Sequence, residues 1–232
     1  MGVSYGEPFR GFRDHGESPF YCAAGRTPEE TWEISVNRLA EVLASLGALA
    51  AAGPIEMSNE LLCSWHREIF GSLFPEDAGR LRWRRAGEWE HVQFGGLIGT
   101  ERSRRVRGYR GANPRELSRR LQKICDEFNA TAAELRSTGG ESYPAVHAAA
   151  RLYAKILRAH PWIDGNLRAA IVALDAALLT LGLPRVEFKD LELHDRLLGV
   201  AFVGKHDPYR PLAEHILQMI REMDTGGSTP YP

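Results

Sequence analysis

The segment from Arg168 to Leu181 is almost wholly apolar on every side. A helix of this composition has no face to turn to water, so the segment predicts a helix buried inside the fold. Helical patterns precede and follow it, and neither an internal repeat nor a linker separates them. We therefore expect one all-α domain, a helical bundle that contains this buried helix, with a small β-hairpin inserted.

The other predicted helices are marked by apolar residues at helical spacing and by capping residues. The clearest start is Thr27-Pro28-Glu29-Glu30, which combines a capping hydroxyl, proline at the first helical position and acids in the first turn. Further starts are expected near Ser58, Asn113-Pro114, Ser142, Asp190 and Pro208.

The remaining segments lack helical periodicity. Residues 80–111 hold short extended stretches separated by glycines, which predict the hairpin. Residues 1–26, rich in glycine, proline and arginine, are expected to form an irregular arm, and residues 225–232 a disordered tail. This leaves residues 27–224 as the predicted domain.

The composition excludes several kinds of protein. The cysteines, Cys22, Cys63 and Cys125, are far apart and show no zinc-ligand spacing, so we expect neither a disulfide framework nor a zinc site. A net charge of −1 provides no basic field for nucleic acid. The N-terminus has no apolar core of a secretory signal, and the apolar run from Leu39 to Ala52 is too short to cross a membrane. We expect a cytoplasmic protein that binds neither nucleic acid nor a membrane, although a specialised secretion signal near the N-terminus is compatible with the sequence.

Residues 160–168 read His-Pro-Trp-Ile-Asp-Gly-Asn-Leu-Arg and connect two predicted helices. A residue before proline is pushed out of the α region, so the first helix should end near Ala159. The buried helix starts just beyond Asn166, where its free N–H groups and its dipole attract anions. Gly165 lets the backbone approach a ligand closely, and Arg168 offers a planar fork suited to phosphate oxygens.

The other polar residues of this loop fit phosphate-transfer chemistry. His160 is a natural general base for a hydroxyl group, because an unperturbed histidine titrates near neutrality. Asp164 supplies the hard oxygen ligand that Mg²⁺ prefers beside nucleotide phosphates. Each residue alone has a plainer interpretation, as a helix-end histidine, a turn or a surface arginine. Their combination in this order predicts an enzyme that transfers part of a nucleoside triphosphate to a hydroxyl group.

The loop that begins at His160 resembles the signature of the Fic family, which is written HPFx(D/E)GNGRxxR. The stretch from Leu62 to Gly79, followed by Arg82, is similar to a second pattern of that family. Together the two stretches extend the resemblance over about residues 58–182, which would form the core of a Fic-type domain spanning residues 27–224.

The resemblance implies an all-α Fic fold and the transfer of AMP from ATP to a serine, threonine or tyrosine hydroxyl of another protein, with Mg²⁺ as cofactor. It implies that His160 is the general base and that Asp164 holds the Mg²⁺ ion. The anion-binding positions would be Gly165, Asn166, Leu167 and Arg168. A β-hairpin flap that holds the target segment would lie within residues 84–107, with its strand at His91, Val92, Gln93 and Phe94.

Two positions depart from the family signature. Leu167 stands where the family has its second glycine, and Ile171 stands where it has its last arginine. The Doc branch, which resembles Fic but transfers a phosphoryl group, also lacks that arginine and has lysine at the glycine position. Three functions therefore stay open: AMP transfer, transfer from another donor (Doc-like phosphoryl transfer or another nucleotide derivative), and non-catalytic binding on a degenerate Fic fold.

Two ways of inhibiting the expected activity are compatible with the sequence. The sequence holds no clean copy of the (S/T)xxxE(G/N) motif whose glutamate blocks the clamp arginine in many Fic proteins. Glu30 and Glu33, in the helix that begins after Thr27, are candidates for such a glutamate. The alternative is a separate inhibitory, antitoxin-like partner.

Overall fold

The computed structural model describes residues 23–82, 112–139 and 142–224, and this part of the chain is all-α. The helices are α1 (Pro28–Ala52), α2 (Asn59–Phe70), the short 3₁₀-helix η2 (Pro114–Glu116), α3 (Leu117–Thr138), α4 (Ser142–Ala159), α5 (Asn166–Thr180), α6 (Leu191–Val203) and α7 (Arg210–Asp224). Each helix expected from the sequence is present, so the predicted fold class is confirmed.

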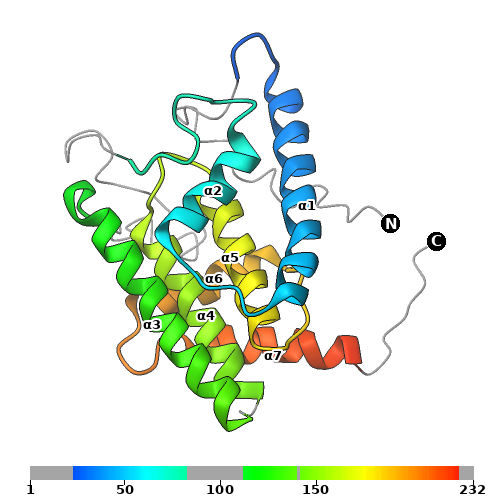
Figure 1. The fold of residues 1–232 in the computed structure, drawn as a ribbon, viewed down its shortest axis with the longest axis vertical. Coiled ribbons are helices and arrows are strands. Elements are labelled where there is room, and N and C mark those ends of the chain that lie inside the picture. Colours follow the sequence, from blue (N-terminus) through cyan, green and yellow to red (C-terminus); the bar gives the residue numbers. More distant parts are fainter. Residues whose placement is uncertain (1–22, 83–111, 140–141, 225–232) are drawn as a thin grey trace, which may run out of the picture.

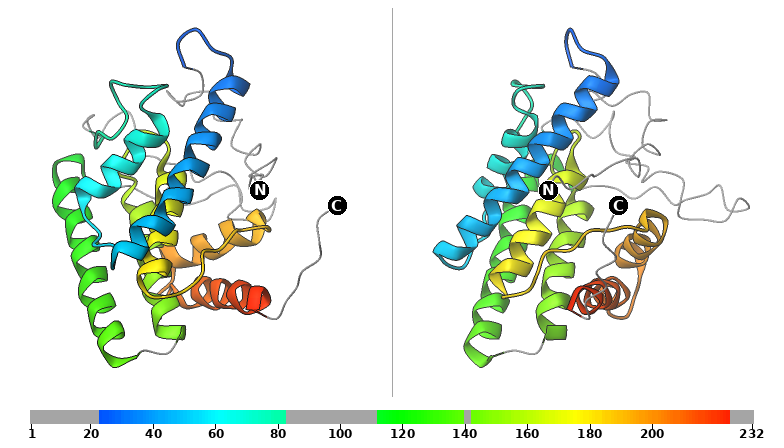
Figure 2. Two further views of the ribbon diagram at one scale, coloured as in Figure 1. Left: turned by 45° about the vertical axis from the view of Figure 1, so that its right-hand side comes forward. Right: turned by 90° about the vertical axis from the view of Figure 1, so that its right-hand side faces the viewer.

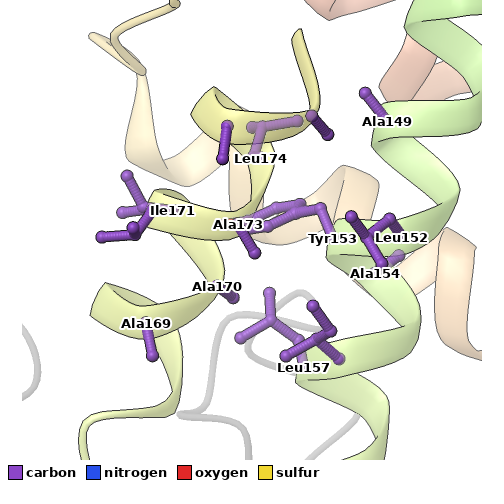
Figure 3. Close-up of a cluster of buried hydrophobic side chains, with 14 of the residues drawn as sticks. Ala149, Leu152, Tyr153, Ala154, Leu157, Ala169, Ala170, Ile171, Ala173 and Leu174 are labelled. Carbon is purple, nitrogen blue, oxygen red and sulfur yellow. The ribbon is translucent and has the colours of Figure 1, made fainter. Parts of the chain in front are cut away.

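Helix α5 lies in the middle of the bundle, as its sequence predicts (Figure 1). It packs against α4 along its length and also contacts α1 and α2, while α3 and α7 pack on other sides of α4 (Figure 2). Alanines on the facing sides of α4 and α5 allow the two backbones to approach closely, and Tyr153 fills the space beside them (Figure 3). The apolar composition of α5 is therefore explained by neighbours on several sides.

The helix starts follow the predicted capping chemistry. Thr27 and Glu30 form a reciprocal capping box: the Thr27 hydroxyl accepts from the Glu30 N–H group, and the Glu30 carboxylate accepts from the Thr27 N–H group over 2.7 Å. Ser58 caps α2 and Asp190 caps α6 without a reciprocal bond, each through a side-chain oxygen that accepts from an N–H group in the first turn. Helix α5 differs, since Gly165 at its N-cap provides no side chain to satisfy the first N–H groups.

Helix α1 is longer than the apolar run that we recognised within it. At 25 residues, with a mean hydropathy of 1.3 in its most apolar window, it is long and apolar enough to cross a membrane by length and composition alone. Its buried residues Leu39, Leu43 and Leu46 instead belong to the hydrophobic core, and the helix contacts α2 and α5. Packing in the bundle thus accounts for the apolar residues on the buried face of the helix.

Three predicted segments lie wholly or mostly outside the described residues: the N-terminal arm, the β-hairpin flap and the C-terminal tail. The flap residues His91, Val92, Gln93 and Phe94 are among them. Leu81 and Arg82, at the start of the expected extended region, are described and adopt no regular secondary structure.

Candidate active site

The loop between α4 and α5 begins with a backbone conformation that L-amino acids rarely adopt. His160 has a φ angle of 48°, in the left-handed region, and its N–H group donates to the carbonyls of Ile156 and Leu157 in the last turn of α4. This is the position after a helix where glycine is favoured, and Pro161 then prevents the helix from continuing. A histidine here costs on the order of 1–3 kcal/mol of backbone strain, which is typical of residues with a functional role.

Arg82 holds this strained turn from outside the loop. Its side-chain Nε donates to the carbonyl of His160 over 2.6 Å, and its backbone N–H donates to the carbonyl of Pro161 over 2.8 Å. A third bond runs from its guanidinium to the carbonyl of Ala112, at the start of the segment that leads into α3. The sequence placed Arg82 in a family pattern but did not indicate this role. Three chain segments are thereby joined at the turn.

Asn166 connects the two ends of the loop. Its side-chain oxygen accepts from the Trp162 N–H group, and its amide nitrogen donates to the Trp162 carbonyl, each over 3.0 Å. The same amide nitrogen lies 3.1 Å from Nε2 of His160. Because an amide NH₂ group can only donate, Nε2 is the unprotonated nitrogen and can act as the base. Burial, with the nearby charge of Arg82, lowers the pKa of His160 to about 3, so the ring is neutral at physiological pH.

Gly165 is required by both backbone and space. Its φ angle of 72° is left-handed, and a Cβ atom built on it would lie 2.3 Å from Cε2 of Phe70 and 3.0 Å from Nε2 of His66. The loop therefore passes directly over the end of α2. Within the structure the group that Gly165 approaches closely is the side chain of Phe70, and its approach to a ligand stays a prediction.

His66, from α2, is a buried histidine that supports the loop. Its Nδ1 accepts from the Gly79 N–H group over 2.9 Å, which places the proton on Nε2, and Nε2 donates to the carbonyl of Asp164 over 2.9 Å. The ring also stacks on Trp162, with 4.6 Å between centroids. Burial lowers the pKa of His66 to about 4, in accord with a neutral ring that uses both nitrogens.

The N-terminus of α5 provides the groups for an anion. Asn166, Leu167 and Arg168 form its first turn, whose N–H groups have no intrahelical acceptor and no side-chain cap. The side chain of Leu167 is partly buried and packs against the hydrophobic core. Leucine at this position keeps the backbone N–H group and directs its bulk toward the core. Ile171, one turn further, is 8% exposed and in Figure 3 points away from α4.

Arg168 is held by aromatic rings. Its guanidinium carbon lies 4.6 Å from the ring centroid of Trp32 in α1 and 5.4 Å from that of Phe70 in α2. Burial lowers the pKa of Arg168 to about 10, partly offset by the charge of Asp164, so the group stays cationic at neutral pH. The sequence indicated Trp32 only as an apolar position of α1.

Asp164 is compatible with a magnesium ion shared with a nucleotide. One carboxylate oxygen accepts from the Gly165 N–H group, and burial raises the pKa of the acid while Gly165 and Arg168 lower it. The described residues include no cluster of three or more potential ligands. Mg²⁺ commonly takes one or two carboxylates and completes its shell with phosphate oxygens and water. A single carboxylate beside an anion-binding helix end therefore fits that mode of binding.

Within the part of the chain that the structure describes, no ion pair joins Arg168 to either of the two glutamates considered as inhibitory residues. Glu30 is exposed and caps its own helix, and Glu33 is exposed. The α1 residue that contacts Arg168 is Trp32.

Known proteins share sequence patterns and the fold with this chain. The model of the Fic/DOC family matches residues 56–178, a range that includes α2, α3, α4, the loop and most of α5. Among solved structures, a Fic domain containing signaling protein from Bacteroides thetaiotaomicron has a TM-score of 0.59 and 17% sequence identity, covering 87% of this chain and 70% of that chain.

Two further structures show the same fold. BepC from Bartonella tribocorum, a VirB-translocated effector solved with bound AMPPNP, has a TM-score of 0.56 and 17% identity over 82% of this chain and 87% of its own. A fragment of Fic-1 from C. elegans has a TM-score of 0.58 and 23% identity over 87% of this chain, which spans 53% of that fragment. At these identities the likeness concerns the fold.

Proposed function

Because the chain belongs to the Fic/DOC family, whose members generally transfer AMP or other nucleotide groups to proteins, we propose that it transfers AMP from ATP to a hydroxyl group of a protein. The observation that carries the proposal is the position of Asn166. Its side chain contacts Nε2 of His160, and its backbone opens the uncapped helix end of α5. A base and an anion site are thus joined by one residue.

In this reaction the hydroxyl oxygen of the target forms a bond to the α-phosphorus of ATP, and the bond from that phosphorus to the β-phosphate oxygen breaks, releasing pyrophosphate. The proton of the hydroxyl passes to Nε2 of His160, where the hydroxyl replaces Asn166 as hydrogen-bond partner. The N–H groups of the first turn of α5 and the guanidinium of Arg168 receive phosphate oxygens. Mg²⁺ held by Asp164 and the phosphates would neutralise charge on the departing pyrophosphate.

The hydrogen bond from Asn166 supports the role of His160 as base, because it fixes the tautomer whose Nε2 can accept a proton. The packing of Leu167 against the core supports catalysis over a degenerate binding protein, since the phosphate side of the helix end keeps its backbone donors.

Ile171 favours a second candidate, transfer of the γ-phosphoryl group. The position that carries an arginine in the family signature is here a core residue. Arg168 is the one cation in α5, so the orientation of the triphosphate rests on fewer charges. A donor bound in the reverse direction would place the γ-phosphate, and not the α-phosphate, at His160.

A paired labelling assay tests both candidates. Full-length protein is incubated with Mg²⁺, lysate proteins and ATP labelled at either the α- or the γ-phosphate. The variant His160→Ala is assayed in parallel. The control is His147→Ala, since His147 lies earlier on α4 and pairs with Asp207. We expect α-label on protein with wild type and His147→Ala only. Transfer of γ-label alone would assign phosphoryl transfer. No His160-dependent label from ATP, GTP or UTP would contradict both and favour a binding protein.

A further inference from the structure

The contacts of Arg168 differ from those of Arg82, the other arginine described at the site. Arg82 uses the edge of its guanidinium, donating to two backbone carbonyls. Arg168 makes no hydrogen bond to any residue within the described ranges, and its contacts there are with the faces of Trp32 and Phe70 and with the charge of Asp164. Its N–H groups therefore make no hydrogen bond to the protein in this part of the chain, while two aromatic rings lie beside its guanidinium carbon.

Three separate elements create this arrangement. Trp32 comes from the second turn of α1, Phe70 is the last residue of α2, and Arg168 lies in the first turn of α5. Phe70 is 1% exposed and is fixed between the loop at Gly165 and the ring of His66. One ring of the pair is thus rigid, and Trp32 is the partly buried ring that completes the contact.

The physical consequence concerns preorganisation. An arginine side chain loses rotamer freedom when it binds an anion, and aromatic stacking before binding reduces that loss. A guanidinium that is held by aromatic rings and makes no hydrogen bond to the described part of the protein keeps its N–H groups for an anion, and carboxylate and phosphate oxygens recognise those groups bidentately. This matters here because Ile171 replaces the second arginine of the family signature, so one guanidinium must serve the polyphosphate.

We propose that Trp32 is a positioning residue of this active site: together with Phe70 it holds the guanidinium of Arg168 so that its N–H edge receives the phosphates of the nucleotide. The inference rests on the proposed function in one respect, that the ligand of Arg168 is a polyphosphate. It assigns to α1 a contribution to nucleotide binding through an aromatic side chain.

The test is calorimetric binding of MgATP and of inorganic tripolyphosphate to the full-length protein. The variants are Trp32→Leu, Trp32→Phe, Arg168→Gln and the double variant Trp32→Leu/Arg168→Gln, with Tyr209→Leu, just before α7, as a matched aromatic control. We expect Trp32→Leu to weaken binding by about tenfold, which is the range of a partly desolvated cation–π contact. Trp32→Phe should bind within about threefold of wild type because it keeps an aromatic face, and Tyr209→Leu should bind as wild type.

The double variant decides whether Trp32 acts through Arg168. We expect it to bind no more weakly than Arg168→Gln alone, since without the guanidinium the ring has nothing to position. Additive losses, or a Trp32→Leu protein that binds as wild type, would overturn the proposal. Wild-type binding that depends on both residues without any label transfer would contradict the proposed function and leave the positioning role intact. Failure of wild type to bind either probe would contradict both.

Discussion

The Nε2–H group of His66 donates to the backbone carbonyl of Asp164 over 2.9 Å, although the two residues are 98 positions apart in the sequence. Helix α2 thereby fixes the residue that carries the candidate magnesium ligand. The other ring nitrogen of His66 accepts from Gly79, so a single neutral imidazole joins the loop after α2 to the loop before α5. Support of this kind from a second layer of residues is what keeps a catalytic loop in place.

Replacing His66 should therefore cost more than the loss of a core ring. His66→Phe keeps an aromatic side chain but leaves the Gly79 N–H group and the Asp164 carbonyl without this partner, at a cost of about 2–4 kcal/mol. His66→Gln can still donate and accept, so we expect a clearly smaller loss. Urea denaturation of both variants measures the difference, and equal losses would show that the two hydrogen bonds contribute little.

Gly165→Ala should be among the most damaging single-methyl additions in the chain. Its Cβ would lie 2.3 Å from buried Phe70 in addition to the left-handed strain, for a loss of about 3 kcal/mol or more. Gly182→Ala is the matched control: its φ angle of 74° is nearly the same, but a Cβ there meets nothing within 4 Å. Backbone strain alone should cost that control about 1 kcal/mol. Thermal unfolding of both variants separates the loss of stability caused by the contact with Phe70 from the loss caused by backbone strain. Equal losses in the two variants would show that the contact with Phe70 costs nothing.

The left-handed conformation of His160 predicts that replacing it by glycine destabilises the protein less than replacing it by alanine. His160→Gly should be more stable than His160→Ala by about 1 kcal/mol, because glycine adopts a φ angle of 48° without a Cβ penalty. Within helices the order is the reverse. Chemical denaturation distinguishes the outcomes, and an alanine variant at least as stable as glycine would show that the turn relaxes.

The neutral state of His160 predicts the pH dependence of the reaction. The kcat/KM value reports ionisations of the free enzyme, and a base with a pKa of about 3 stays unprotonated well below neutrality. From pH 8 down to about pH 5 the profile should lack the acidic limb that an ordinary histidine produces near pH 6.5. Initial rates at low ATP test this, with folding checked at each pH by tryptophan fluorescence. A limb near pH 6.5 that tracks His160 would contradict the expectation.

Asp175 makes a separate contribution to pH-dependent stability. It is 2% exposed in α5, and burial raises its pKa to about 7, while Arg185 and the N–H group of Val186 lower it. The native state thus binds a proton that the unfolded chain releases above about pH 4, so this group costs stability progressively as pH rises from 4 to 7. Asp175→Asn should stabilise the protein by roughly 2–4 kcal/mol at pH 8 and by little at pH 4. Urea titrations at both pH values measure this gain in the free energy of unfolding, with the exposed Asp126→Asn as control. An equal gain for Asp175→Asn at both pH values would contradict the prediction.

Much of the fold follows from local sequence. The capping box of Thr27 and Glu30, the proline after His160 and the apolar surface of α5 are determined by neighbours within one or two turns of the chain. Such signals define where helices begin, where they end and which one is buried. The order of residues from His160 to Arg168 predicts a phosphate site, because the free N–H groups of a helix N-terminus attract anions, and this stays a prediction.

The tertiary structure decided how that site is supported. The hydrogen bond from His66 to Asp164, the hydrogen bond from Arg82 to His160 and the cation–π contact of Trp32 with Arg168 each join residues far apart in sequence. A helical pattern marks Trp32 as apolar but does not say which side chain it will meet, because that depends on how α1 lies against α5. Local capping residues and apolar periodicity determined where the helices begin and end, and long-range packing determined the environment of the charged and titratable groups.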